Sequence, residues 1–168
     1  MPESRRWYLD TVVLSSFALT SRLDLLTTRY GRRAHITQEV LGEISDGIAA
    51  GYLALRAVEE AMAAGGLTSG TALSAEERAV YGDLLRALSS GEASCIACAQ
   101  VRGGTVATDD RAARGCCAAR DIPCTGTIGI LKACCRDGTL ALAEADAVLQ
   151  GMVDAGFYAP VRRLSDLM

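Results

Sequence analysis

Hydrophobic residues occur along this chain in two alternating kinds of run. The short runs are rich in β-branched and aromatic residues, as in strands that are buried in a parallel sheet. The longer runs carry an apolar residue every three or four positions, as on one face of a helix. Because the two kinds alternate and the loops between them are short, the pattern predicts an α/β fold with a parallel sheet between helical layers.

The expected strands are short, and capping signals bound several of the helices. The first strand is expected from Trp7 to Leu14, a run that alternates and then becomes wholly apolar. Further strands are expected at Ala34 to Ile36, Thr105 to Thr108, Ile122 to Thr125 and, at a sheet edge, Leu67 to Leu73. Helices are expected at Ser16 to Leu26, Thr37 to about Gly47, Leu53 to Ala64, Ser74 to about Leu88, Gly126 to Asp137 and Ala143 to Ala155. Two more are expected on either side of the third strand: one that begins at Glu92 and ends at the break of Gly103 and Gly104, and one that follows Asp109 and Asp110 and runs to Arg120. The end, Val161 to Met168, fits either a short docked helix or a frayed tail.

Length and composition indicate one domain. A chain of 168 residues buries one full core and is short for two. Half of its residues are hydrophobic and 22% are charged, which excludes intrinsic disorder. No apolar run reaches the roughly 18 residues that cross a bilayer, and the first residues contain no secretory-type apolar stretch. We therefore expect a single domain over residues 1–168 that acts in the cytoplasm and not in a membrane.

Seven cysteines lie in apolar runs, and their number is odd. Disulfide frameworks belong to small secreted chains with poor cores, so reduced, buried thiols are the better interpretation here. Cys95 and Cys98 form a C-x-x-C pair. Neither a second pair nor a histidine is spaced to complete a zinc site, since His35 is the single histidine.

The net charge of −3 argues against a protein that coats nucleic acid by bulk electrostatics. It does not exclude an enzyme that holds phosphates through metal ions. Almost all basic residues are arginines, with Lys132 the single lysine. Several are clustered: Arg5 with Arg6, Arg29 with Arg32 and Arg33, Arg111 with Arg114, and Arg162 with Arg163. Bidentate phosphate contact and genomic base composition are both adequate explanations of this preference.

Acidic residues follow two of the expected strands. Asp10 interrupts the first apolar run, and Asp109 and Asp110 come directly after Thr105 to Thr108. Side chains at the carboxyl ends of parallel strands face the crevice in which ligands bind, so these acids are candidates for a site. Asp10 is also a good N-cap for the next helix, and it can serve both roles.

Two glutamates extend this set. Glu43 lies one turn after Glu39, on the helix that follows the second strand. Glu92 lies in the first turn of its helix, where the helix dipole also favours an acid. A solvated helix flank is the usual environment of glutamate, but the position of Glu43 soon after a strand favours a site.

The chemistry that suits such a cluster is metal-assisted hydrolysis. Unpaired carboxylates share a crevice at a cost, because like charges raise each other's pKa, and a divalent cation removes that cost. Clusters of oxygen ligands suit Mg²⁺ or Mn²⁺ better than zinc. These ions act on phosphodiesters by activating water and neutralising charge on the leaving group, with two ions about 4 Å apart where both are bound.

Other catalytic patterns fit less well. His35 follows a basic turn and has no nucleophile assigned to it, so a Ser-His-Asp arrangement is not indicated. The run TGTIGILK, Thr125 to Lys132, lacks the spacing of a phosphate-binding P-loop. A phosphatase of the haloacid-dehalogenase type requires an acid two residues after Asp10, where Val12 stands.

Four segments, in this order, resemble the motifs of the PIN-domain nucleases. They are YLDTVVLSSFA at Tyr8–Ala18, ITQEVLGEI at Ile36–Ile44, GEASCIACA at Gly91–Ala99 and VATDDRAAR at Val106–Arg114. The last two are similar to a branch of the family that has GEA followed by DDR-x-AR. The tail Ile122–Leu140, which contains GTIGILKACCRDGTL, is also similar to that branch, so the resemblance covers nearly the whole chain.

The resemblance implies a three-layer α/β/α fold with about four to five short parallel strands, and a helical insertion at about 51–88. It also implies metal-dependent cleavage of RNA, often by the toxin of a toxin–antitoxin pair and often by a homodimer. Asp10, Glu43, Glu92 and Asp110 correspond to the family's catalytic metal ligands, with Asp109 as an assistant or alternative to Asp110. The expected cofactor is Mg²⁺ or Mn²⁺, and the expected partners are substrate RNA and an antitoxin protein.

Two functions are therefore expected. The first is a Mg²⁺- or Mn²⁺-dependent endoribonuclease. The second is a PIN-like module with weak or no catalysis that binds RNA or a protein, which is motivated by the acidic net charge and by Val12. Many family members have Asn or Ser at the position of Val12, where the side chain orients the first acid.

Overall fold

The computed structural model describes residues 5–70 and 72–168. Within them, five short strands form one parallel sheet in the order β3-β2-β1-β4-β5. The strands are β1 (Trp7–Leu9), β2 (Ala34–Ile36), β3 (Thr68–Ser69), β4 (Thr105–Ala107) and β5 (Cys124–Thr125). In the central pair Trp7 is opposite Thr105 and Leu9 is opposite Ala107, so β1 and β4 end at the same level.

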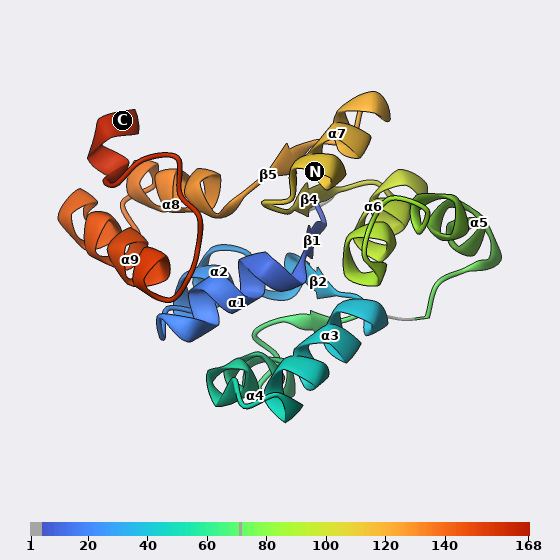
Figure 1. Cartoon of the computed structure of the whole chain (residues 1–168), viewed down its shortest axis with the longest axis horizontal. Coiled ribbons are helices and arrows are strands. Elements are labelled where there is room, and N and C mark those ends of the chain that lie inside the picture. The colour runs from blue at the N-terminus through green and yellow to red at the C-terminus, as the bar shows by residue number, and fades with distance from the viewer. Residues whose placement is uncertain (1–4, 71) are drawn as a thin grey trace.

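Helices cover both faces of this sheet (Figure 1). They are α1 (Thr11–Leu19), α2 (Asp24–Arg29), α3 (Gln38–Ala49), α4 (Arg56–Ala63), α5 (Ala75–Leu84), α6 (Ser90–Arg102), α7 (Arg111–Ala119), α8 (Thr127–Arg136) and α9 (Leu142–Asp154). Three 3₁₀ segments are η1 (Gly31–Arg33), η2 (Leu53–Leu55) and η3 (Leu164–Leu167). In Figure 1, α1, α2, α8 and α9 lie on one side of the sheet and α5, α6 and α7 on the other. The predicted three-layer α/β/α fold is confirmed.

Helix α6 is the main support of the central strands. It contacts β1 and β4, and α5 packs along its outer side. Every residue from Ala93 to Ala99 is buried, and most of them are small. A helix that is apolar on all sides is suited to such a position between two layers. Small side chains let α6 pack closely against β1 and β4, so the first turn of α6 lies near the carboxyl ends of these strands.

The predicted first strand is wrong beyond Leu9. The chain leaves the sheet at Asp10, which has extended backbone angles and accepts a hydrogen bond from the Thr11 N–H as the N-cap of α1. The apolar residues Val13 and Leu14 are still buried, but on a helix instead of a strand. An apolar run does not distinguish a buried strand from a buried helix, and here the capping aspartate decides.

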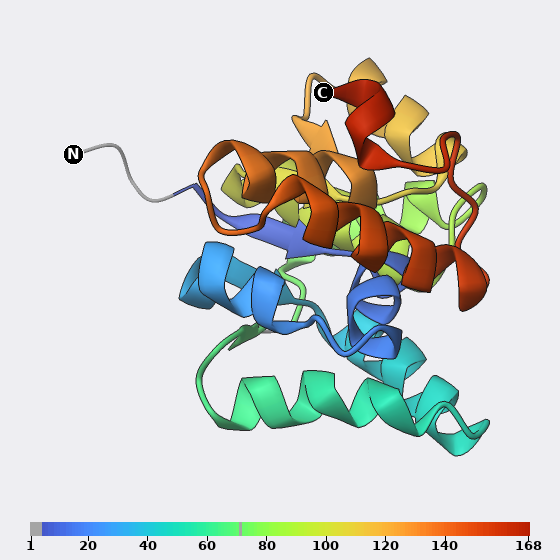
Figure 2. The same ribbon diagram turned by 90° about the vertical axis from the view of Figure 1, so that its left-hand side faces the viewer.

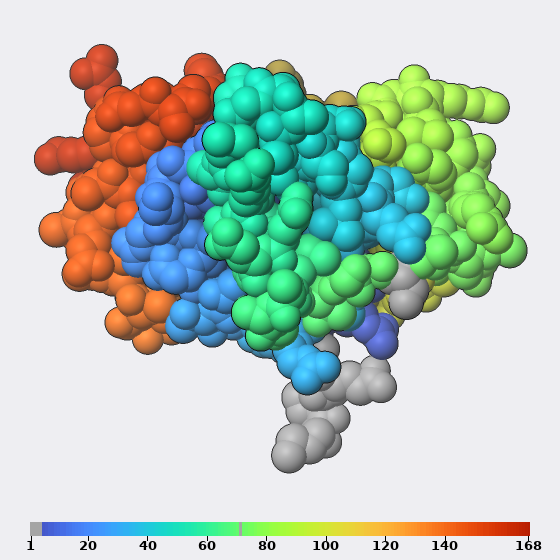
Figure 3. All heavy atoms as spheres, turned by 90° about the horizontal axis from the view of Figure 1, so that it is seen from below, coloured from blue at the N-terminus to red at the C-terminus, as the bar shows by residue number. Residues whose placement is uncertain are grey.

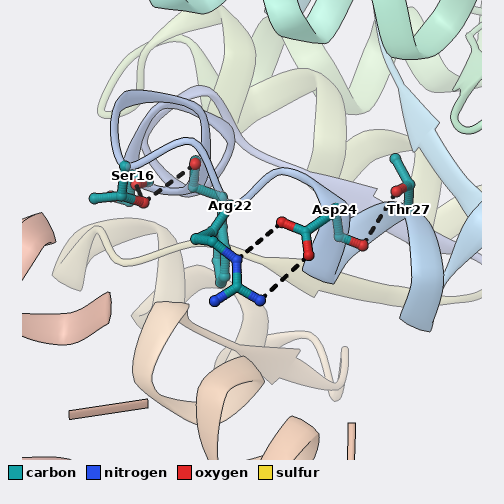
Figure 4. A network of polar contacts seen from close by, with 6 residues as sticks. Ser16, Arg22, Asp24 and Thr27 are labelled. Atoms are coloured by element: carbon teal, nitrogen blue, oxygen red, sulfur yellow. Dashed lines mark hydrogen bonds and ion pairs between the residues drawn. The ribbon is translucent and has the colours of Figure 1, made fainter. Parts of the chain in front are cut away.

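The single helix predicted from Ser16 to Leu26 is two helices. Ser21 has φ of +57°, which interrupts helical geometry after α1. The side chain of Arg22 then holds the next turn by donating from Nε and Nη2 to the two oxygens of Asp24, at 3.0 and 3.2 Å (Figure 4). Thr27 donates to the carbonyl of Asp24 in the same network.

Residues 51–88, which were expected to form a helical insertion, contain η2, α4, β3 and α5. Viewed from below, α3 and α4 form the centre of the surface, between α1–α2 and the green segment of α5 (Figure 3). The edge strand that was expected at Leu67 to Leu73 is reduced to the two residues of β3. Thr71, which falls in the expected range, lies outside the described residues. Helix α5 ends at Leu84, earlier than expected, and begins with the predicted capping box of Ser74 and Glu77.

The last residues dock onto the domain. Leu164 in η3 is fully buried, and Ser165 donates from its N–H and its hydroxyl to the carboxylate of Asp146 in α9. The docked alternative for the chain end is therefore confirmed. Figure 2 shows α9 running alongside α1, which it contacts. No helix in the described part of the chain is both long enough and apolar enough to traverse a lipid bilayer.

Candidate active site

The carboxyl ends of β1 and β4 bring the first acids together. The Asp10 N–H donates to the carbonyl of Ala107 at 2.9 Å, which continues the sheet one residue past both strands. Thr108 then donates from Oγ1 to Asp10 Oδ2 at 2.8 Å. Asp10 and the segment from Thr108 to Asp110 therefore lie at one edge of the sheet, as the strand pattern predicted.

Asp10 is the buried centre of the group, with 2% of its surface exposed. Burial is the main reason that its pKa rises from about 3.8 to about 7. The hydrogen bonds from Thr108 and Thr11 act against this rise, and the charges of Glu92 and Glu43 add to it. A charged carboxylate here is therefore unfavourable unless a cation compensates it.

Glu43 reaches the same region from α3. The Thr11 hydroxyl donates to Glu43 Oε1 at 2.6 Å, so the residue after Asp10 holds the second acid. The carboxylate also lies against the backbone of Gly91, where a Cβ atom would collide with Glu43 Oε1. Gly91 thus allows α3 and the start of α6 to meet with the acid between them.

Glu92 lies in the first turn of α6 and closes a capping box. Its Oε2 accepts from the Ser89 N–H at 3.0 Å, and its own N–H donates to Ser89 Oγ at 3.3 Å. Burial raises the pKa of Glu92, the backbone hydrogen bond from Ser89 lowers it, and the charges of Asp110 and Glu43 raise it further. The capping role and membership of the acid group are therefore compatible, as expected.

The adjacent acids Asp109 and Asp110 point to different places. Asp110 caps α7 by accepting from the Ala113 N–H at 2.8 Å, and its own N–H donates to Thr108 Oγ1 at 3.3 Å. Thr108 consequently links Asp110 to Asp10. Asp109 instead accepts from the N–H and the hydroxyl of Thr127, at 2.8 and 2.6 Å, and so fixes the start of α8.

A comparison with protein-family models matches residues 6–168 to the family DUF3368, described as a PIN domain. The chain belongs to this PIN-domain family. PIN domains are generally nucleases, so the match supports a nuclease-type fold for this chain. A search of curated proteins found no match.

The acids of this PIN domain form an oxygen-only donor set. In the described part of the chain, Glu43, Glu92 and Asp110 each have one carboxylate oxygen that accepts no hydrogen bond. Across residues 5–70 and 72–168, no three His, Cys, Asp or Glu side chains converge tightly enough to enclose an ion as they stand. Mutual repulsion of carboxylates opposes such convergence until a cation compensates it. The donor chemistry fits Mg²⁺ or Mn²⁺, and rotation of the side chains is needed to surround one.

Three residues of the site were not predicted from the sequence of this PIN domain. Thr11 and Thr108 each follow a strand end and donate to an acid, and Gly91 leaves the space that Glu43 fills. The threonines could have been found from their place beside predicted acids at strand ends. The contact between Gly91 and Glu43 has no signal in the sequence, because the two residues lie on different helices.

The cysteines and the single histidine were the other candidates for chemistry. All seven cysteines are free, and Cys95 and Cys98 are both buried in α6. His35 lies on β2 and contacts the ring of Tyr8, with 5.7 Å between ring centroids.

Proposed function

We propose that this PIN domain is a Mg²⁺- or Mn²⁺-dependent endoribonuclease. The observation that carries the proposal is the gathering of carboxylates from four separate parts of the chain at the carboxyl edge of the sheet. Asp10 follows β1, Glu43 comes from α3, Glu92 from the start of α6 and Asp110 from the start of α7. A ligand crevice at this edge is the general expectation for parallel sheets.

Asp10, Glu43, Glu92 and Asp110 would hold the metal. Asp110 is preferred to Asp109 because Thr108 links Asp110 to Asp10, whereas Asp109 accepts from Thr127 at the start of α8. The bound ion would supply an activated water and neutralise charge on the leaving oxygen of a phosphodiester. Thr108 and Thr11 would keep Asp10 and Glu43 aimed at the site. With a pKa of about 7, Asp10 is protonated in about half of the molecules at neutral pH, and a bound cation would favour its charged form.

A cavity that Asp109 lines supports a single-stranded nucleic acid as substrate. It has a volume of about 450 Å³ and its lining includes Asp109, Arg114 and the aromatic residues Phe157 and Tyr158. Tyr158 is 89% exposed, so a nucleobase can stack on its ring. Arg114 supplies a cation suited to a phosphate. A base and its phosphate would thus be held at the side of β4 and β5 to which Asp109 points.

The test is cleavage of an end-labelled single-stranded RNA with added Mn²⁺ or Mg²⁺. Asp10→Asn and Asp110→Asn should each reduce the rate at least about a hundredfold, because each removes a charge that holds the ion. Asp121→Asn is the matched control, since Asp121 is exposed and its positive φ is one that Asn adopts readily. Cleavage that persists in chelator and in Asp10→Asn would refute the proposal.

The second candidate is a PIN module that binds RNA or a protein without catalysis. It is favoured by the local hydrogen bonds of the acids, each of which already caps or contacts a neighbouring element. Calorimetric titration with Mn²⁺ separates the two functions. Binding by the wild type that Asp110→Asn abolishes supports the nuclease, and absence of binding supports the module.

We also propose the biological setting that the family resemblance implies: a cytoplasmic toxin whose partner is an antitoxin protein, acting as a homodimer. Light scattering should then give twice the chain mass of 17.6 kDa. A small reading frame directly upstream whose product inhibits RNA cleavage would support the toxin role, and a chain that is monomeric and uninhibited would contradict it.

A further inference from the structure

The amino ends of the central strands surround a second cavity, on the sheet edge opposite the acids. Its volume is about 540 Å³, and its charged lining consists of Arg5, Arg6, Arg32, Arg33 and Arg102. His35 also lines it, but burial and the charges of Arg6 and Arg102 lower the pKa of this histidine and favour its neutral form. The topology explains this gathering. Arg5 and Arg6 precede β1, η1 with Arg32 and Arg33 precedes β2, and Arg102 ends α6 just before β4. We call it the arginine cavity.

Most arginines of the arginine cavity have no acidic partner in the part of the chain that the structure describes. Arg102 forms an ion pair with Glu77, with 2.8 Å between Nη2 and Oε1. Among the described residues, the other four arginines of the cavity have no carboxylate within ion-pair distance. The whole chain has a net charge of −3, so this concentration of positive charge is a local feature.

The arginine side chains of the cavity differ in whether they make hydrogen bonds within the described residues. Arg6 donates to the carbonyl of Arg102 at 3.1 Å, and Arg33 donates to the carbonyls of Tyr30 and Arg29. Arg5 and Arg32 are exposed and make no side-chain hydrogen bond within the described residues. The two guanidinium groups held by hydrogen bonds and the two exposed ones can together contact an anion that enters from solvent.

We propose that the arginine cavity binds a phosphate-bearing ligand. Guanidinium groups present paired N–H donors that match phosphate oxygens in bidentate fashion. The lining in the described part of the chain is arginine and histidine, apart from Gly103 and Gly104. A protein partner normally requires apolar or aromatic contacts at the centre of its interface, and the lining offers little of either. A compact ligand with several negative charges fits this cavity better than an acidic peptide.

This site is separate from the proposed metal site. Only the three residues of β1 lie between Arg6 and Asp10, a span of about 13 Å at roughly 3.3 Å per residue. The two residues nevertheless lie at opposite edges of the sheet. Phosphate binding in the arginine cavity should therefore occur without any divalent ion, and its failure would leave the nuclease proposal untouched.

The experiment is calorimetric titration in EDTA with inorganic pyrophosphate as the probe. Wild type should bind, and the double variant Arg5→Ala/Arg32→Ala should bind at least about tenfold more weakly, since it loses two charge-assisted contacts. Both side chains are exposed, so the fold should be retained. The control Arg86→Ala/Arg162→Ala removes the same charge from two exposed arginines elsewhere and should change the affinity less than about twofold.

Short RNAs with a 5′-phosphate or a 5′-hydroxyl distinguish the sources of phosphate. Binding of pyrophosphate alone supports a free phosphate or nucleotide, a preference for the 5′-phosphate supports an RNA end, and equal binding of both RNAs supports internal phosphates. Absence of binding by all three probes overturns the inference. An equal loss in the control variant also overturns it, as does binding of polyglutamate in place of phosphate, which would indicate an acidic protein partner.

Discussion

Asp10→Asn should stabilise the metal-free protein at alkaline pH, although it removes a central residue of the proposed active site. The cause is the cost of a carboxylate that is buried beside other acids. Asparagine has nearly the same shape and carries no charge. Its amide oxygen can still accept from the Thr11 N–H, and its amide group can donate to the oxygen of Thr108.

The magnitude follows from the pKa of about 7 in the folded protein against about 3.8 when unfolded. The folded state holds the proton more tightly, so this contribution to stability is fully present below about pH 4 and is lost as pH rises through about 7. At about 1.4 kcal/mol per pKa unit, the loss is about 4 kcal/mol in total, of which about 3 kcal/mol falls above pH 5. The uncharged amide of the variant has no such dependence.

The assay is thermal unfolding in EDTA at about pH 5 and about pH 8. The melting temperature of the variant minus that of the wild type should rise between these pH values by about 6–12 °C, for a domain of this size. Asp121→Asn should show no such trend, because Asp121 is exposed. Mn²⁺ at the higher pH should raise the melting temperature of the wild type and leave that of Asp10→Asn unchanged. A temperature difference that is equal at both pH values would refute the reasoning.

Three further predictions test other parts of the site and fold. Gly91→Ala should reduce metal-dependent cleavage at least about tenfold, because its methyl group displaces the carboxylate of Glu43. The control Gly115→Ala should leave cleavage unchanged, because a methyl group there meets no atom within 4 Å. Burial alone would raise the pKa of Glu77, but hydrogen bonds from Arg102 bring this pKa down to about 2. Glu77→Gln should therefore lower the free energy of unfolding by about 3 kcal/mol at pH 7. That difference should vanish in urea titrations as the pH falls from about 4.5 through 2. Asp109→Asn should retain Mn²⁺ binding by calorimetry and Asp110→Asn should lose it; the opposite result would reverse the assignment of the pair.

The sequence was sufficient to predict the fold class and the positions of most elements. Short apolar runs alternating with helical periodicity specify a parallel sheet covered on both faces, because each element must bury its own apolar side. The same pattern did not locate the end of β1. Val12, Val13 and Leu14 are good strand formers, and only the hydrogen bond of the Asp10 cap shows that they belong to α1.

The adjacent aspartates show a second limit. Asp109 and Asp110 have the same chemistry, and the sequence left both as candidate ligands. Their separation depends on the turn between β4 and α7 and on Thr127, which is 18 residues away from Asp109 along the chain. Long-range contacts of this kind are specified by packing of whole elements, and no local pattern records them.

The shortness of β1 gives the molecule an electrical polarity. Arginines stand at one end of a three-residue strand and carboxylates at the other, so a dissolved polyanion meets attraction on one side and repulsion on the opposite side. Without divalent ions, the polyanion would therefore meet the protein most often on the side of the arginine cavity. Raising the concentration of these ions would therefore change the preferred approach of a nucleic acid as well as the speed of any reaction that follows.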